Sequence, residues 1–368
     1  MKKSIIAVAG AAAVALTLAA CGAAPDGDGA SAEPTREKED IEIVDGFKAC
    51  MVSDQGGWDD QSFNQSGYEG LTDAEEFLGV EINAVESTSD SEYAPNIDSL
   101  ITDGCTYIIG VGFLLEPGIQ AAAEKNPDIQ FALIDSSLSN DDFSLLELPN
   151  VKPLLFNTAE AAFLAGYAAA GTTESGIVGT FGGLPLPSVK IFMDGFYDGV
   201  QQYNEDNDTD VKVLGWDKAD QEGGSFTGDF ENQANGTTTA QGFLDQGADI
   251  IMPVAGPVGL GAATAVQSAD GKLIWVDSDG FLSTEYGDII MTSVMKEIGE
   301  AVYASIRDAA QGEFDATPYV GTLENGGVAL APFHDFEDSV PAELADKIAD
   351  YQKRIISGDF VVESVNTP

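Results

Sequence analysis

The segment FKACMVSDQGGWDDQSFNQSGYEGLTDAEEFLG, residues 47–79, contains a short apolar strand, a polar loop and a helical stretch, in that order. Gly56 and Gly57 in the loop favour a tight turn directly after the strand. In the helical stretch, Phe63, Leu71 and Leu78 fall near one face. The segment therefore predicts a strand, its exit loop and the start of the helix that follows.

Ten further apolar strands follow along the chain, and helical segments separate most of them. They are EINAVES, TYIIGVG, IQFALIDS, KPLLFN, GIVGTFG, VKVLGWD, DIIMPVAG, KLIWVDSD, DIIMTSVM and GGVALAPF. Continuous apolar strands that alternate with helices predict parallel sheets covered on both faces. Eleven strands are more than one open sheet of this type usually contains, so we expect an α/β protein of two doubly wound lobes. A (β/α)8 barrel is the competing architecture, but the uneven spacing in the C-terminal part disfavours it.

The N-terminus has the features of an export signal. Lys2 and Lys3 precede an apolar run that ends in LAA, and Cys21 follows. We expect residues 1–20 to be a signal peptide, because the run is alanine-rich and slightly short for a transmembrane helix. LAAC also resembles the bacterial lipobox, which implies lipidation of Cys21. Residues 21–47 are rich in Gly, Ala, Pro and charge, and we interpret them as a flexible acidic tether.

The chain has 368 residues and a formal net charge of −46. This length allows two domains, and this charge excludes nucleic acid as a partner, because phosphates would be repelled. We interpret the charge as a solvated surface, so a single Asp or Glu carries little information. Cys50 and Cys105 lie in an exported chain, where a disulfide is permitted. Two buried free thiols are the alternative.

Glycines, acidic residues and aromatic residues gather directly after the predicted strands. In open α/β sheets, the carboxyl ends of the strands form the edge where ligands bind. Two lobes that face each other with these edges form a cleft that can close. The candidate ligand-binding residues are Asp54, Trp58, Phe63, Asn64, Gln65, Phe113, Asp135, Phe226, Gly256, Asp277, Asp279 and Lys296.

Signals for catalysis and for metal binding are weak. His334 is the one histidine, no G-x-S-x-G motif precedes it, and a zinc site would need more His or Cys ligands. No phosphate-binding glycine motif and no EF-hand loop occurs. We therefore expect no catalytic residue, metal or cofactor. The aromatic faces and polar groups of the candidate residues suit a neutral, flat, hydroxylated molecule.

Several segments resemble one known family. SDQGGWDDQSFNQSGYEGL, AEAAFLAGYAAAGTTESGIVGTFGG, the stretch from GSFTGDF to PVAGPVGLGAA, IWVDSD and TSVMKEIGEAV are similar to the BMP family of basic membrane lipoproteins. That family includes purine nucleoside receptor lipoproteins that feed ABC transporters. The resemblance covers nearly everything from Phe47 to about Ala310, and D-x-G-G-x-x-D-x-SFNQ is its most specific motif.

The resemblance implies a type I periplasmic-binding-protein fold with three hinge crossovers. We expect an N-terminal lobe of residues 48–155 plus about 293–318, and a C-terminal lobe of residues 156–292 plus about 319–368. The implied roles are carried over by position. Phe63 and Phe226 would stack on the base, and Asp54, Asn64 and Asp135 would bind its polar edge. Gly256 would contact the ligand through its backbone. Asp277 and Lys296 would hold the ribose hydroxyls. Asp279 is the alternative to Asp277.

This chain departs from the family pattern at three positions. Trp58 stands where a smaller aliphatic residue is usual, Gln61 where lysine is usual, and Gly280 where glutamine is common. Trp58 could trim or line the pocket and so change the purine preference.

The resemblance and the residues together predict a monomeric, lipid-anchored solute-binding protein on the extracytoplasmic face of the cell membrane. It would capture a nucleoside, of the purine class, and deliver it to an ABC permease without covalent chemistry. A receptor for a free sugar or another small solute on the same fold is one alternative. A surface hydrolase acting on nucleosides or glycosides is the other.

Overall fold

The computed structural model describes residues 36–140, 142 and 144–368, and residues Lys38–Pro368 form one compact unit. The predicted signal peptide and Cys21 lie outside the described residues. Within the described part of the chain, no helix combines the length and the apolar character that a membrane span requires.

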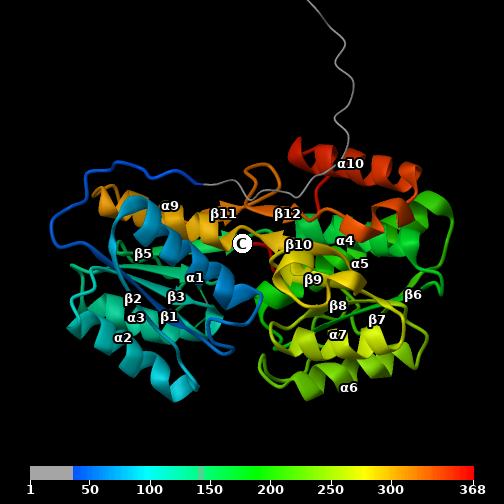
Figure 1. Ribbon diagram of the computed structural model, residues 1–368, viewed down its shortest axis with the longest axis horizontal. Helices are drawn as coiled ribbons and strands as arrows, with labels where there is room; N and C mark the ends of the chain where they lie inside the picture. The colour runs from blue at the N-terminus through cyan, green and yellow to red at the C-terminus, as the bar shows by residue number, and fades with distance from the viewer. Residues whose placement is uncertain (1–35, 141, 143) are drawn as a thin grey trace, which may run out of the picture. The chain divides into compact units, whose positions relative to one another are not determined.

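The first sheet has six strands in the order β11-β5-β4-β3-β1-β2, and every pair of neighbours is parallel. Its strands are short apolar runs, and all residues of β3 are buried. Helices lie on both faces of this sheet (Figure 1). The elements are β1 (Lys48–Ser53), β2 (Glu81–Val85), β3 (Tyr107–Val111), β4 (Gln130–Ile134), β5 (Val151–Phe156) and β11 (Tyr319–Gly321), with α1 (Phe63–Asp73), α2 (Tyr93–Thr102), α3 (Glu116–Lys125) and α9 (Ile298–Ala310).

The second sheet has the corresponding order β12-β10-β9-β8-β6-β7, and only the β10–β12 pair is antiparallel. Helices again cover both faces (Figure 1). The elements are β6 (Ile177–Gly182), β7 (Lys212–Leu214), β8 (Ile250–Val254), β9 (Lys272–Asp277), β10 (Ile290–Lys296) and β12 (Val328–Leu330), with α4 (Ala159–Thr172), α5 (Pro187–Asn207), α6 (Gln233–Leu244), α7 (Val258–Ser268), α8 (Gly280–Ser283) and α10 (Ala342–Ile356). Two separate open sheets confirm the predicted pair of doubly wound lobes and not a closed barrel.

The chain passes between the two sheets three times. It crosses from β5 through α4 to β6, from β10 through α9 to β11, and from β11 directly to β12. The predicted boundaries differ in detail from these crossings. The predicted boundary at about residue 293 divides β10, but all of β10 belongs to the second sheet. The predicted boundary at about residue 319 assigns β11 to the C-terminal lobe, but β11 pairs with β5 in the first sheet. Sequence analysis did not predict β11, a strand of three residues.

The core has three parts. One continuous cluster of buried apolar residues lies under α1, α9, α4 and α5 and joins the two sheets. Two separate clusters fill the opposite faces, one in each lobe. Cys50 in β1 and Cys105, just before the neighbouring β3, belong to the cluster of the first lobe and form a disulfide bond. The joint cluster holds the strand ends of both lobes at one cleft.

Candidate functional site

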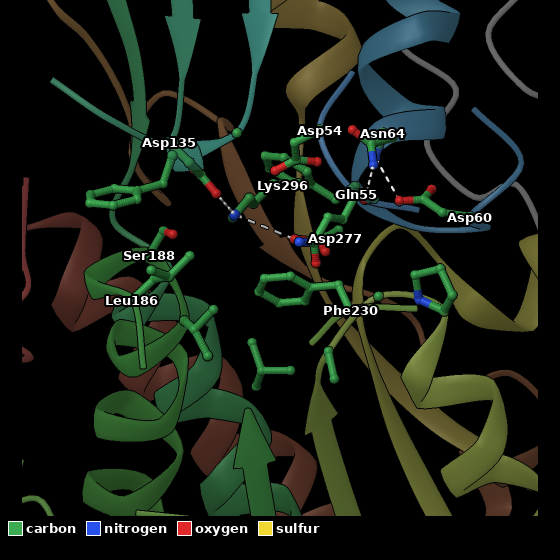
Figure 2. A pocket seen from close by; sticks show the side chains of 18 of the residues that line it. Asp54, Gln55, Asp60, Asn64, Asp135, Leu186, Ser188, Phe230, Asp277 and Lys296 are labelled. Carbon is green, nitrogen blue, oxygen red and sulfur yellow. Dashed lines mark hydrogen bonds and ion pairs between the residues drawn. The ribbon is translucent and has the colours of Figure 1, made fainter. Parts of the chain in front are cut away.

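A pocket lies at the carboxyl ends of the strands of both sheets (Figure 2). In each sheet the strand order reverses beside the first strand of the lobe, between β1 and β3 and between β6 and β8. Such a reversal opens a crevice, because the loops on its two sides run in opposite directions. Asp54, which follows β1, and Gly112, which follows β3, line the pocket from the first lobe, and Ala255 and Gly256, after β8, line it from the second. Both lobes therefore build the site, as the sequence predicts.

Asp60 fixes the start of α1. Its Oδ1 accepts hydrogen bonds from the backbone N–H groups of Ser62 and Gln65, both at 3.0 Å, and its Oδ2 accepts one from Asn64 at 2.8 Å. These N–H groups have no partner within the helix, so a carboxylate is favoured here. Burial nevertheless raises the pKa of Asp60 to about 6. The contact holds Phe63, the first residue of α1, at the pocket wall.

Asn64 lies on the next position of α1 and is buried. Its Nδ2 donates to the carbonyl oxygen of Gln55 at 2.9 Å, which fixes the amide plane. Its Oδ1 is buried and has no hydrogen-bond partner in the described structure. A buried acceptor without a partner costs free energy, so a donor from a ligand would be favoured at this oxygen.

Asp54 is a buried carboxyl group that no described base neutralises. It is 7% exposed, and burial raises its pKa well above the usual range, against the effect of the nearby Asn64 amide. A β-carbon at Gly112 would lie 2.0 Å from Asp54 Oδ2, so only glycine allows the carboxyl group to occupy this position. Asp54 is thus available to a ligand with N–H or O–H groups.

Lys296 joins the two lobes at the pocket floor. It ends β10 of the second sheet and forms an ion pair with Asp135, which follows β4 of the first sheet. Its Nζ also lies 3.4 Å from Oδ1 of Asp277 at the end of β9, and Figure 2 shows the nitrogen between the two carboxylates. Burial lowers the pKa of Lys296, but Asp135 and Asp277 outweigh it and raise the pKa. The lysine is therefore charged and already paired.

Four phenylalanine rings line the pocket. Phe63 and Phe113 come from the first lobe, and Phe192 and Phe230 from the second. Lys296 Nζ lies 4.9 Å from the ring centroid of Phe63 and 5.0 Å from that of Phe192, distances at which a cation interacts with an aromatic face. The pocket thus combines flat apolar walls with buried polar groups.

The structure does not bring Phe226 into the pocket lining. A β-carbon at Gly182 would lie 2.7 Å from the Phe226 ring, whereas one at the adjacent Gly183 would lie 2.4 Å from the Phe230 ring. Successive residues at the end of a strand point to opposite faces, so the two rings lie on different sides. The Phe226 ring contacts Trp216 edge to face at 6.1 Å, and Phe230 lines the pocket.

Three other predicted residues also lie outside the lining. Trp58 stacks on Tyr68 at 5.1 Å, and Gln65 donates to Glu69 at 2.9 Å. Asp279 accepts the N–H of Phe281 and contacts His334 Nε2 at 2.7 Å. Of the two acids in DSD, the structure thus places Asp277 in the pocket. The predicted residues that do line it are Asp54, Phe63, Asn64, Phe113, Asp135, Gly256, Asp277 and Lys296.

Sequence reasoning missed several lining residues. Asp60 belongs to the quoted glycine-rich segment, and its place three residues before Phe63 is the signal that could have identified it as a helix-capping acid. Phe192 lies inside α5, where a phenylalanine is usually core. The remaining missed lining residues are Gln55, Gly112, Leu186, Ser188, Val189, Phe230, Val254, Ala255 and Pro257.

Comparisons with known proteins agree with this architecture. The model of the Bmp family, described as ABC transporter substrate-binding protein PnrA-like, matches residues 47–365. The ABC transporter nucleoside-binding protein BmpA of Lactococcus lactis is 30% identical, over 99% of this chain and 100% of that protein. An uncharacterized lipoprotein of Pyrococcus horikoshii is 27% identical, over 87% of this chain and 80% of that protein. The crystal structure of an ABC transporter solute-binding protein from Aeropyrum pernix is similar with a TM-score of 0.75 and 25% identity, covering 86% of this chain and 94% of that one.

Proposed function

Because the chain belongs to the Bmp family of PnrA-like ABC transporter substrate-binding proteins, we propose that its cleft binds a nucleoside of the purine class. A substrate-binding protein of this kind binds a solute and works with a permease. The nucleoside is our proposal, and the name of the Lactococcus lactis relative supports it. The observation that carries it is the pairing of phenylalanine rings from both lobes with buried carboxyl groups in one cleft.

The two kinds of group suit the two parts of a nucleoside. Phe63 and Phe230 supply one ring from each lobe for the faces of the base. Asp54 and the unpaired Oδ1 of Asn64 supply acceptors for N–H groups at its edge. Asp277 is held beside Lys296, and a carboxylate next to an ammonium group suits ribose hydroxyls, which both donate and accept.

Two roles differ from those that the family resemblance implies. Asp135 is paired with Lys296, so we assign it to the ribose side of the cleft and not to the base edge. Phe230 replaces Phe226 as the second ring. Gly256, with a positive φ of 52°, keeps its proposed backbone contact with the ligand.

The charge balance favours a neutral ligand. Asp54, Asp60, Asp135 and Asp277 line the pocket, whereas Lys296 is its single base among the described residues and is already paired. A phosphate group would meet these carboxylates without a free cation. A base stacked on an aromatic ring gains roughly 1–3 kcal/mol, and a hydrogen bond to a charged group about 1.5–3 kcal/mol. Two stacks and a few such bonds reach the roughly 8 kcal/mol of micromolar affinity.

Calorimetry tests the proposal directly. Adenosine, guanosine, inosine, uridine, ribose and inosine 5′-monophosphate are titrated into the protein. We expect heat from purine nucleosides, and none from the monophosphate at the same concentrations. No heat from any nucleoside would reject the nucleoside assignment, and equal affinity for ribose would favour the free-sugar receptor. Release of free base during incubation, followed by chromatography, would favour the hydrolase.

We further propose that Cys21 carries a lipid that holds the folded unit at the extracytoplasmic face of the membrane, as a monomer that delivers its ligand to an ABC permease. The lipobox-like LAAC motif and the lipoprotein name of the Pyrococcus horikoshii relative support this. Cell fractionation of the wild-type protein and of Cys21→Ser tests it. The wild-type protein should sediment with membranes, and finding it equally soluble with the variant would contradict the anchor.

A further inference from the structure

Gln61 lies between Asp60 and the start of α1, and its backbone has an unusual conformation. Its φ is +57°, in the left-handed region that residues with a β-carbon rarely adopt. The residue belongs to the loop after β1, in the first lobe. Its neighbours are fixed within that lobe, because Asp60 accepts the N–H groups of Ser62 and Asn64, and the Gln61 N–H donates to Gln65 Oε1 at 3.2 Å.

The Gln61 carbonyl oxygen accepts hydrogen bonds only from the second lobe among the described residues. The donors are Trp275 Nε1 at 3.2 Å, Ser278 Oγ at 3.0 Å and Ser283 Oγ at 3.3 Å. Trp275 lies in β9, Ser278 follows that strand, and Ser283 ends α8. We call these three bonds the Gln61 contact. A strained residue whose carbonyl is satisfied entirely by the other lobe keeps its partners only while the lobes are together.

Gly280, the first residue of α8, leaves the space that this contact needs. A β-carbon at Gly280 would lie 2.4 Å from Cγ of Trp275, so any side chain at this position would displace the indole. Glycine there leaves Trp275 where its N–H reaches the Gln61 oxygen.

The Gln61 contact is continuous with the ligand site. The next residue, Ser62, donates from Oγ to Asp277 Oδ2 at 2.9 Å and to the carbonyl oxygen of Val276 at 3.1 Å. Asp277 faces Lys296 in the pocket, and Phe63 lines it. The segment that touches the second lobe is therefore the segment that holds a pocket wall.

We propose that Gln61 is a positioning residue whose backbone carbonyl holds the lobes closed over the bound ligand and slows its release. The role belongs to the main chain, since the side-chain Oε1 is buried without a hydrogen-bond partner in the described structure. This inference rests on the proposed function in one respect only, which is the choice of a nucleoside as the ligand in the release experiments.

Two substitutions separate the main chain from the side chain. Gln61→Gly and Gln61→Val both remove the amide, but glycine adopts a positive φ freely and a β-branched residue does so least readily. Stopped-flow measurement of inosine release should show a dissociation rate about tenfold higher in Gln61→Val, and a rate within about twofold of wild type in Gln61→Gly. Equal acceleration in both variants would assign the role to the side chain. No acceleration in either would overturn the proposal.

A second pair of variants tests the donors. Ser278→Ala combined with Ser283→Ala removes two of the three bonds from the other lobe and should also raise the dissociation rate severalfold. Ser268→Ala is the matched control, because Ser268 donates only to Thr264 within α7. The melting temperature of each variant without ligand verifies folding. A release rate equal to that of the control would overturn the role of these donors.

A ligand-free readout keeps this test separate from the nucleoside assignment. Hydrogen–deuterium exchange over residues 272–283 should be faster in Gln61→Val than in Gln61→Gly, because the lobes separate more often. If the wild-type protein binds no nucleoside, the proposed function fails while this comparison still decides the role of Gln61. Equal exchange in the two variants would overturn it.

Discussion

Replacing Phe230 with alanine should weaken nucleoside binding strongly, whereas replacing Phe226 should not. The two rings are four residues apart in the loop between β7 and α6, and each packs on one of two adjacent glycines, Gly183 and Gly182. Only Phe230 lines the pocket. The pair is therefore matched in residue type, lobe and loop, and differs in the side to which the ring points.

The magnitude follows from the contact that each ring makes. A base loses roughly 1–3 kcal/mol when its stacking ring is removed, which is about a 5- to 150-fold weaker Kd for Phe230→Ala. Phe226 instead packs on Trp216, so Phe226→Ala loses core contacts. Truncating a buried phenylalanine costs about 3–5 kcal/mol of stability, and we expect about half of that because Phe226 is only partly buried.

Calorimetry with inosine and urea unfolding without ligand measure the two effects. We expect Phe230→Ala to raise Kd with a small change in the unfolding midpoint, and Phe226→Ala to lower the midpoint with Kd within about threefold of wild type. A loss of affinity in Phe226→Ala as large as that in Phe230→Ala would refute the assignment. It would show that Phe226 turns into the cleft when ligand binds.

Three further predictions concern stability. Lys296→Met leaves the Asp135 carboxylate buried without its cation, so urea unfolding should show a loss of about 3–5 kcal/mol; an unchanged midpoint would contradict the ion pair. The pKa of Asp60 rises from 3.8 to about 6 on folding, so the folded state binds a proton at this carboxyl group more tightly than the unfolded state does. The stability that this protonation provides is lost as pH rises from about 4 through about 6. The free energy of unfolding should therefore fall by about 2.4 kcal/mol more between pH 4 and pH 7 in wild type than in Asp60→Asn, and parallel pH profiles would disprove it. Cys50 and Cys105 are 55 residues apart, and Cys50→Ala with Cys105→Ala should lose up to about 4 kcal/mol in thermal unfolding; reducing agent should have no effect on that double variant.

Much of the fold could be predicted because its signals are local. The alternation of apolar strands with amphipathic helices is visible in the sequence itself and predicts parallel sheets. Each predicted strand overlaps a strand of the structure. The lobe boundaries were harder. No predicted strand covers β11, and only its pairing with β5 assigns it to the first sheet.

The sequence alone determined the two-lobed architecture, the edge of the sheets where polar and aromatic residues gather, and eight of the nineteen residues that line the cleft. These depend on order along the chain, since the residue after a parallel strand must lie at the carboxyl edge. The sequence spacing did not distinguish Phe226 from Phe230. The two rings pack on the adjacent residues Gly182 and Gly183, and only the folded backbone shows which of the two rings faces the cleft. Tertiary structure also decided the pairing of Lys296 with Asp135 across the lobes, and the contact of Gln61 with Trp275, 214 residues away. Such contacts form only when two lobes meet, so no local pattern in the chain encodes them.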